Sequence, residues 1–76
     1  MTNLAHSHVL ALDFGGTKLA AAVVDTSNGN ILAVKREATP AAQGADASIK
    51  TMFALGKQLL QECNLQSPGM VGISFG

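Results

Sequence analysis

The chain has 76 residues with five basic and five acidic side chains, so its formal net charge is zero. These charges are spread along the chain and form no basic patch, which argues against a nucleic-acid partner. A chain of this length forms one domain at most, and so small a domain buries only about 60% of its unfolded surface. No apolar run reaches transmembrane length, so no membrane partner is expected. Cys63 is the single cysteine and can form no internal disulfide, which favours a reducing cytoplasm.

The first strand is expected at Val9–Leu12, after a polar lead at residues 1–7 that should fray. The run Val9–Leu12 is continuously apolar, which is typical of a central strand covered on both faces. Asp13 ends the run at the edge where open α/β sheets place their ligands. Residue type alone also allows Asp13 to be a turn-capping carboxylate.

A glycine turn follows, with the sequence Asp-Phe-Gly-Gly-Thr-Lys at residues 13–18. Glycines permit a positive φ and let backbone N–H groups approach a ligand that a Cβ would hold off. A carboxylate at the end of a buried strand can hold Mg²⁺, directly or through water. Thr17 can add a hydroxyl donor, and Lys18 can add a positive charge. The candidate magnesium ligand is therefore Asp13, and the candidate phosphate-binding residues are Gly15, Gly16, Thr17 and Lys18.

Two other glycine motifs that bind nucleotides do not match this turn. The Walker A loop requires G-x-x-x-x-G-K-[ST], whereas here the lysine follows Gly-Gly-Thr. The dinucleotide fingerprint requires G-x-G-x-x-G at the start of a helix, and this stretch has neither the spacing nor a helix start. What remains is the pattern Asp-x-Gly-Gly-Thr-Lys between two apolar runs.

This pattern resembles the first phosphate motif of the superfamily that contains sugar kinases, actin and heat-shock ATPases. Residues 11–18, Ala-Leu-Asp-Phe-Gly-Gly-Thr-Lys, are most similar to the ROK family of bacterial sugar kinases and sugar-responsive repressors. The resemblance implies that Asp13 helps to hold Mg²⁺ and that Gly15, Gly16 and Thr17 lie against the terminal phosphates of ATP. Lys18 also matches, although its side chain can equally point to solvent. The order of elements agrees along nearly the whole chain, but only residues 11–18 are specific.

A β-hairpin is expected after the turn. Residues 18–25 and 30–37 flank Thr-Ser-Asn-Gly at residues 26–29, and short runs on either side of Asn-Gly are typical of antiparallel strands. The charged residues 35–37 are interpreted as a solvated strand end. Residues 38–45, which contain Pro40 and Gly44, form a linker.

A helix is expected to begin near Asp46, whose carboxylate can cap it. Gly56 within it indicates close approach to a strand. Asn64 is expected as the C-cap. Residues 70–75 then form a strand parallel to the first, reached by a right-handed crossover. Helical spacing predicts one face packed on the sheet, with Ile49, Met52, Phe53, Gly56, Leu60 and Cys63.

The expected fold is α/β, with β-β-β-α-β order and a mixed sheet. The resemblance implies an incomplete lobe of the ribonuclease H-like, actin-like ATPase fold, in which residues 1–76 are the N-terminal nucleotide-phosphate-binding part and a second lobe is missing. The implied parent is a cytoplasmic, homo-oligomeric hexose kinase that uses ATP and Mg²⁺. The resemblance also allows a zinc site in the missing part. The family's catalytic base and sugar-binding residues are not among these residues, so the chain alone is predicted to be inactive.

Two other functions stay open. The family includes repressors with a DNA-binding helix-turn-helix in front of this fold, but only 12 residues precede Asp13, too few for that module. The chain can also be a truncated, non-catalytic binding domain in which the glycine turn is structural. The sequence does not distinguish glucose, fructose, mannose and an N-acetylated sugar as the substrate.

Overall fold

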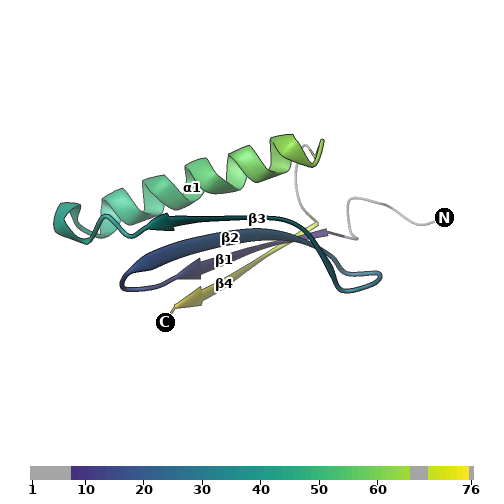
Figure 1. The fold of residues 1–76 in the computed structure, drawn as a ribbon, viewed down its shortest axis with the longest axis horizontal. Helices are drawn as coiled ribbons and strands as arrows, with labels where there is room; N and C mark the ends of the chain where they lie inside the picture. Colours follow the sequence, from purple (N-terminus) through teal and green to yellow (C-terminus); the bar gives the residue numbers. More distant parts are fainter. Residues whose placement is uncertain (1–7, 66–68, 76) are drawn as a thin grey trace.

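The computed structural model describes residues 8–65 and 69–75 (Figure 1), so the polar lead expected at residues 1–7 lies outside the described residues. The chain forms an α/β domain with a mixed sheet, and the predicted β-β-β-α-β order is confirmed. The elements are β1 (His8–Phe14), β2 (Lys18–Asp25), β3 (Asn30–Ala38), the short 3-10 helix η2 (Ala41–Gln43), α1 (Ala45–Glu62) and β4 (Met70–Phe75).

The four strands form one sheet in the order β3-β2-β1-β4. β2 pairs antiparallel with β3 and β1 pairs parallel with β4, both as predicted, and β1 pairs antiparallel with β2. The C-terminal ends of β1, β3 and β4 therefore lie at one end of the sheet, together with the turn from β1 to β2 (Figure 1). Ligands of open α/β sheets bind at this end.

The predicted hairpin of β2 and β3 closes through residues 26–29. Gly29 has a φ of 76°, which glycine adopts without steric cost, and its N–H donates to the carbonyl oxygen of Asp25 over 2.8 Å. A bulge interrupts the pairing, because Val24 lies opposite Ile31 whereas Val23 lies opposite Ala33. Compared with an uninterrupted pairing, the extra residue in β3 places every later β3 side chain on the opposite face of the sheet.

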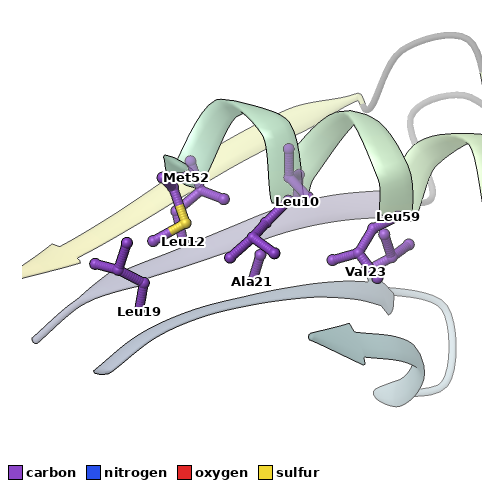
Figure 2. Close-up of a cluster of buried hydrophobic side chains, with 8 residues drawn as sticks. Leu10, Leu12, Leu19, Ala21, Val23, Met52 and Leu59 are labelled. Carbon is purple, nitrogen blue, oxygen red and sulfur yellow. The ribbon is translucent and has the colours of Figure 1, made fainter. Parts of the chain in front are cut away.

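α1 lies over one face of the sheet, here called the inner face, and the opposite face is the outer face (Figure 1). The core lies between α1 and the inner face (Figure 2). Full burial of each large apolar side chain is worth about 1.5–3 kcal/mol, so this cluster is the main source of stability. It consists of Leu10, Leu12, Leu19, Ala21, Val23, Met52, Leu55 and Leu59.

Close approach of α1 to the sheet at Gly56 is confirmed. A Cβ on Gly56 would lie 3.2 Å from Cδ2 of Leu10, which is tighter than ordinary van der Waals contact. Cys63 is half-buried and packs against the core, consistent with the predicted apolar role.

The predicted apolar face of α1 was partly wrong. Ile49 and Phe53 are 43% and 62% exposed, whereas Leu55 and Leu59 are buried together with Met52. Apolar residues flank both sides of the buried stripe, so the sequence pattern alone is ambiguous about which side faces the sheet. α1 contacts β1, β2 and β3, and Ile49 and Phe53 border a groove beside β4.

The predicted cap at Asp46 was also wrong. α1 begins at Ala45 with Gly44 as its N-cap, and no side chain caps the first turn. Asp46 lies within the first turn, where its negative charge interacts favourably with the helix dipole instead.

The C-terminal end of α1 is closed by a Schellman motif. Cys63 is the C-cap, and Asn64, expected to be the cap itself, follows it with a left-handed φ of 57°. The N–H of Asn64 donates to Gln61 over 3.1 Å, and that of Leu65 donates to Leu60 over 2.8 Å. These are the two hydrogen bonds that define the motif.

Two expectations for β1 were wrong. The strand continues through Asp13 to Phe14 instead of ending at Leu12. Within the described residues it is covered on one face only, because α1 packs on the inner face and leaves the outer face open. The Phe14 ring extends the inner face and stacks on that of Phe75, with a centroid distance of 5.2 Å.

Candidate phosphate-binding site

The turn from β1 to β2 is tight at Gly15. The N–H of Gly15 donates to the carbonyl oxygen of Lys18 over 3.0 Å. A Cβ on Gly15 would lie 2.7 Å from that same oxygen, a separation that real structures do not tolerate. The expectation of positive φ was wrong here, because the left-handed glycines of the described residues are Gly29 and Gly44. Gly15 is required by close packing of the backbone, not by its φ.

The tip of the turn consists of Gly16 and Thr17, and both are exposed. A Cβ on Gly16 would meet nothing within 4 Å, so the backbone there is open to a ligand. No hydrogen bond within the described ranges uses the N–H groups of these two residues. Two adjacent unpaired N–H groups can bind an anionic oxygen.

Thr39, just beyond the end of β3, holds the turn in place. Its N–H donates to the carbonyl oxygen of Thr17 over 2.9 Å. Its hydroxyl donates to the carbonyl oxygen of Gly15 over 2.8 Å. Both carbonyls are thereby turned toward β3. Sequence reasoning placed Thr39 in a linker and missed this role, because the contact spans 24 residues and depends on the strand order.

Asp13 belongs to a row of residues that crosses all four strands on the outer face. It lies opposite Ala20 of β2 and Ser74 of β4, and Ala20 in turn lies opposite Arg36 of β3. Asp13, Arg36 and Ser74 line one shallow hollow of about 450 Å³. Small side chains form its floor, and they include Ala11, Ala20, Ala22 and Gly72.

The five predicted site residues divide into two groups. Asp13 lines the outer-face hollow, whereas Gly15, Gly16, Thr17 and Lys18 are not part of its lining. They form the adjoining end of the sheet, where Lys18 is exposed. Strand alternation places Lys18 on the same face as Ala20, and therefore on the face of Asp13. The structure thus places one carboxylate on the same face of the sheet as two exposed cations, Lys18 and Arg36.

Asp13 forms no ion pair with either cation. The ion pair found among the described residues joins Nζ of Lys35 to Oε2 of Glu62 over 3.0 Å, on the inner side of the sheet. The exposed carboxylate of Asp13 therefore remains available to a ligand or a metal ion.

The single exposed carboxylate of Asp13 is compatible with Mg²⁺ binding. Mg²⁺ usually binds one or two carboxylates and completes its shell with water and phosphate oxygens, so one exposed carboxylate beside a phosphate site is sufficient. No cluster of three or more His, Cys, Asp or Glu occurs in the part of the chain that the structure describes. Asp13 would therefore hold the ion as one protein ligand, directly or through water.

Comparison with known proteins adds no relative. A scan of the chain against protein-family models finds no match, and a search of curated proteins finds no significant similarity. In the described residues, no helix combines the length and apolar character needed to cross a membrane.

Proposed function

We propose that this chain is the N-terminal phosphate-binding part of an ATP-dependent sugar kinase of the ROK type. In this proposal, the α/β domain is part of an actin-like ATPase lobe, and the full protein is a cytoplasmic homo-oligomer that phosphorylates a hexose. The observation that carries the proposal is an exposed carboxylate, Asp13, at the C-terminal end of β1, beside a turn with unpaired N–H groups at Gly16 and Thr17. The resemblance of residues 11–18 to the family's first phosphate motif supports it.

Phosphoryl transfer requires positioning and charge neutralisation more than covalent chemistry from the protein. The N–H groups of Gly16 and Thr17 donate to phosphate oxygens, and the Thr17 hydroxyl is a further donor. Asp13 would hold Mg²⁺, directly or through water, and the bound ion would neutralise negative charge on the phosphates. Thr39 keeps the turn in the conformation that exposes these donors.

The exposed apolar surface also supports a larger fold. Phe53 and Phe75 are 62% and 78% exposed, and together with Ile49 and Ile73 they line a groove of about 440 Å³ between α1 and β4. Contiguous apolar surface of this kind is normally covered by further protein. In the proposed kinase, the remainder of the lobe covers this groove and β4.

The proposal is tested by the thermal midpoint of the chain with and without Mg-ATP. A ligand that binds the native state raises the midpoint, and at 100 times its dissociation constant it adds about 2.7 kcal/mol of stability. Asp13→Asn should abolish most of the shift. Asp46→Asn is the matched control, because it makes the same charge change at another exposed site in α1. An unchanged midpoint of the unsubstituted chain would favour a structural role for the glycine turn.

Catalysis is tested separately. The chain alone should phosphorylate no hexose in a coupled assay, because the catalytic base is expected in the missing part. Phosphorylation of any hexose by the pure chain would contradict this division of roles.

A further inference from the structure

The row of residues across the outer face contains a cation that the sequence did not assign to the site. Arg36 is exposed, lines the same hollow as Asp13, and forms no hydrogen bond or ion pair within the described residues. Its guanidinium therefore offers five N–H donors without a protein acceptor. Such a planar set of donors is suited to two oxygens of one phosphate group.

The β3 bulge determines the position of Arg36. Continuation of the pairing from Asp25 and Asn30 without a bulge would place Lys35 opposite Ala20. With the bulge, Arg36 is opposite Ala20 on the outer face, and Lys35 instead pairs with Glu62 of α1. Bulges commonly re-aim side chains next to functional sites.

The surface between Asp13 and Arg36 leaves room for a ligand. Asp13 and Arg36 are separated by one strand, so their backbones are about 9–10 Å apart. Ala20 between them carries only a methyl group, and the two charges do not bridge the gap by an ion pair. An anion that carries a metal ion fits this arrangement, with the metal at Asp13 and a phosphate at Arg36.

We propose that Arg36 is an anion-binding residue of the site, where it binds a phosphate of the nucleotide whose metal ion Asp13 holds. The phosphate chain then crosses Ala20, and the Ser74 hydroxyl lies on the far side of Asp13 in the same row. This inference rests on the proposed function, and it specifies a condensed phosphate with its metal ion as the ligand of the outer-face hollow.

The test is calorimetric titration of the chain with Mg-pyrophosphate and with Mg-ATP. Arg36→Gln should weaken both affinities about tenfold or more, since hydrogen bonds between charged groups are the strong ones. Arg36→Lys should recover part of the loss, because it keeps the charge but not the planar donors. Lys50→Gln is the matched control: it removes one positive charge from an exposed position on α1.

A second pair of variants tests the path of the phosphate without changing charge. Ala20→Val narrows the gap between Asp13 and Arg36 and should weaken binding severalfold. Ala54→Val adds the same bulk at an exposed position of α1, outside the hollow, and should change binding little. Circular dichroism of each variant verifies that the fold is retained.

The outcomes separate the two proposals. If Asp13→Asn weakens binding but Arg36→Gln does not, the role of Arg36 is wrong and the proposed function stands. Equal losses of affinity for Arg36→Gln and Lys50→Gln would indicate an effect of net charge, and they would also overturn the role of Arg36. If the unsubstituted chain binds neither ligand, both proposals fail.

Discussion

The hydroxyl of Thr39 donates a hydrogen bond of 2.8 Å to the carbonyl oxygen of Gly15, joining the end of β3 to the turn between β1 and β2. The donor is part-buried, and the N–H of the same residue donates to Thr17. One residue thus fixes both ends of the segment that we propose to bind phosphate.

Thr39→Val should remove the hydroxyl bond while retaining the side-chain shape. We expect a loss of about 1 kcal/mol in the free energy of unfolding, the usual net value of one hydrogen bond. Urea denaturation measures it. Thr39→Ser, which retains the hydroxyl, is the control and should stay closer to the unsubstituted chain. Equal stability of the valine variant and the unsubstituted chain would show that this bond does not hold the turn.

The two turn glycines should respond differently to alanine. Gly15→Ala forces the Lys18 carbonyl to move, and we expect a loss of about 1–3 kcal/mol, as for overpacked sites. Gly16→Ala meets no neighbour and should change stability by about 0.5 kcal/mol or less. Its effect should instead be weaker Mg-ATP binding, because the new methyl group lies where the phosphate approaches. The reverse order of stabilities would contradict the turn geometry.

Asn64 offers a test at the other end of the domain. Its left-handed φ costs a residue with a Cβ about 1–2 kcal/mol, and asparagine offsets part of this through local hydrogen bonding. Asn64→Ala should therefore lower the free energy of unfolding by about 1 kcal/mol. Asn64→Gly should equal or exceed the original, because glycine is preferred at this position of the Schellman motif. A glycine variant less stable than the alanine variant would exclude this conformation.

The two faces of α1 should differ in tolerance to truncation. Leu59 is fully buried, so Leu59→Ala should cost about 2–5 kcal/mol. Phe53 is 62% exposed, so Phe53→Ala should cost far less in this chain despite the larger side chain. Chemical denaturation of both variants decides between this arrangement and the sequence prediction, in which Phe53 is a core residue. Similar large losses in both would restore the predicted face.

Acid should act partly through Asp25. The hydroxyl and then the N–H of Ser27 donate to its carboxylate over 2.6 and 2.9 Å, and these bonds lower the pKa of Asp25 below its ordinary value of 3.8. Because the pKa of Asp25 is lower in the folded state than in the unfolded state, the ionised carboxylate contributes its full stabilisation to the fold above the unfolded pKa. It is lost as the pH falls through the lower, folded value.

Ser27→Ala removes the larger cause of this shift. We expect the variant to lose less stability than the original when the pH is lowered through and below 3.8. Denaturation midpoints across that range, with Asp25→Asn as the control lacking the titrating group, provide the measurement. If the denaturation midpoints of the original chain and of Ser27→Ala fall equally as the pH is lowered, this linkage would be contradicted.

Local signals predicted most of the fold. Asn28-Gly29 located the hairpin, because a tight turn depends on neighbouring residues. The order of the elements and the rule for crossover connections placed the last strand parallel to the first. The side of α1 that packs on the sheet was predicted poorly. Ile49 and Phe53 border the groove beside β4, so their exposure depends on where α1 lies across the sheet.

The candidate site was predicted only where it is contiguous in sequence. Asp13 and the glycine turn are adjacent, so their pattern is readable. Thr39 and Arg36 reach the same end of the sheet through the hairpin. The bulge that turns Arg36 outward adds one residue to β3, and no turn residue marks it. Candidate site residues on or just beyond other strands, such as Arg36 and Thr39, could therefore be identified only from the strand register of the structure.

Amide chemical shifts, measured by NMR on the ¹⁵N-labelled chain, report whether Mg-ATP binds at the turn between β1 and β2. On addition of Mg-ATP, the amide signals of Gly16 and Thr17 should shift most, and Asp13→Asn should suppress the change. Absence of any shift, or shifts confined to the groove between α1 and β4, would contradict binding of Mg-ATP at this turn.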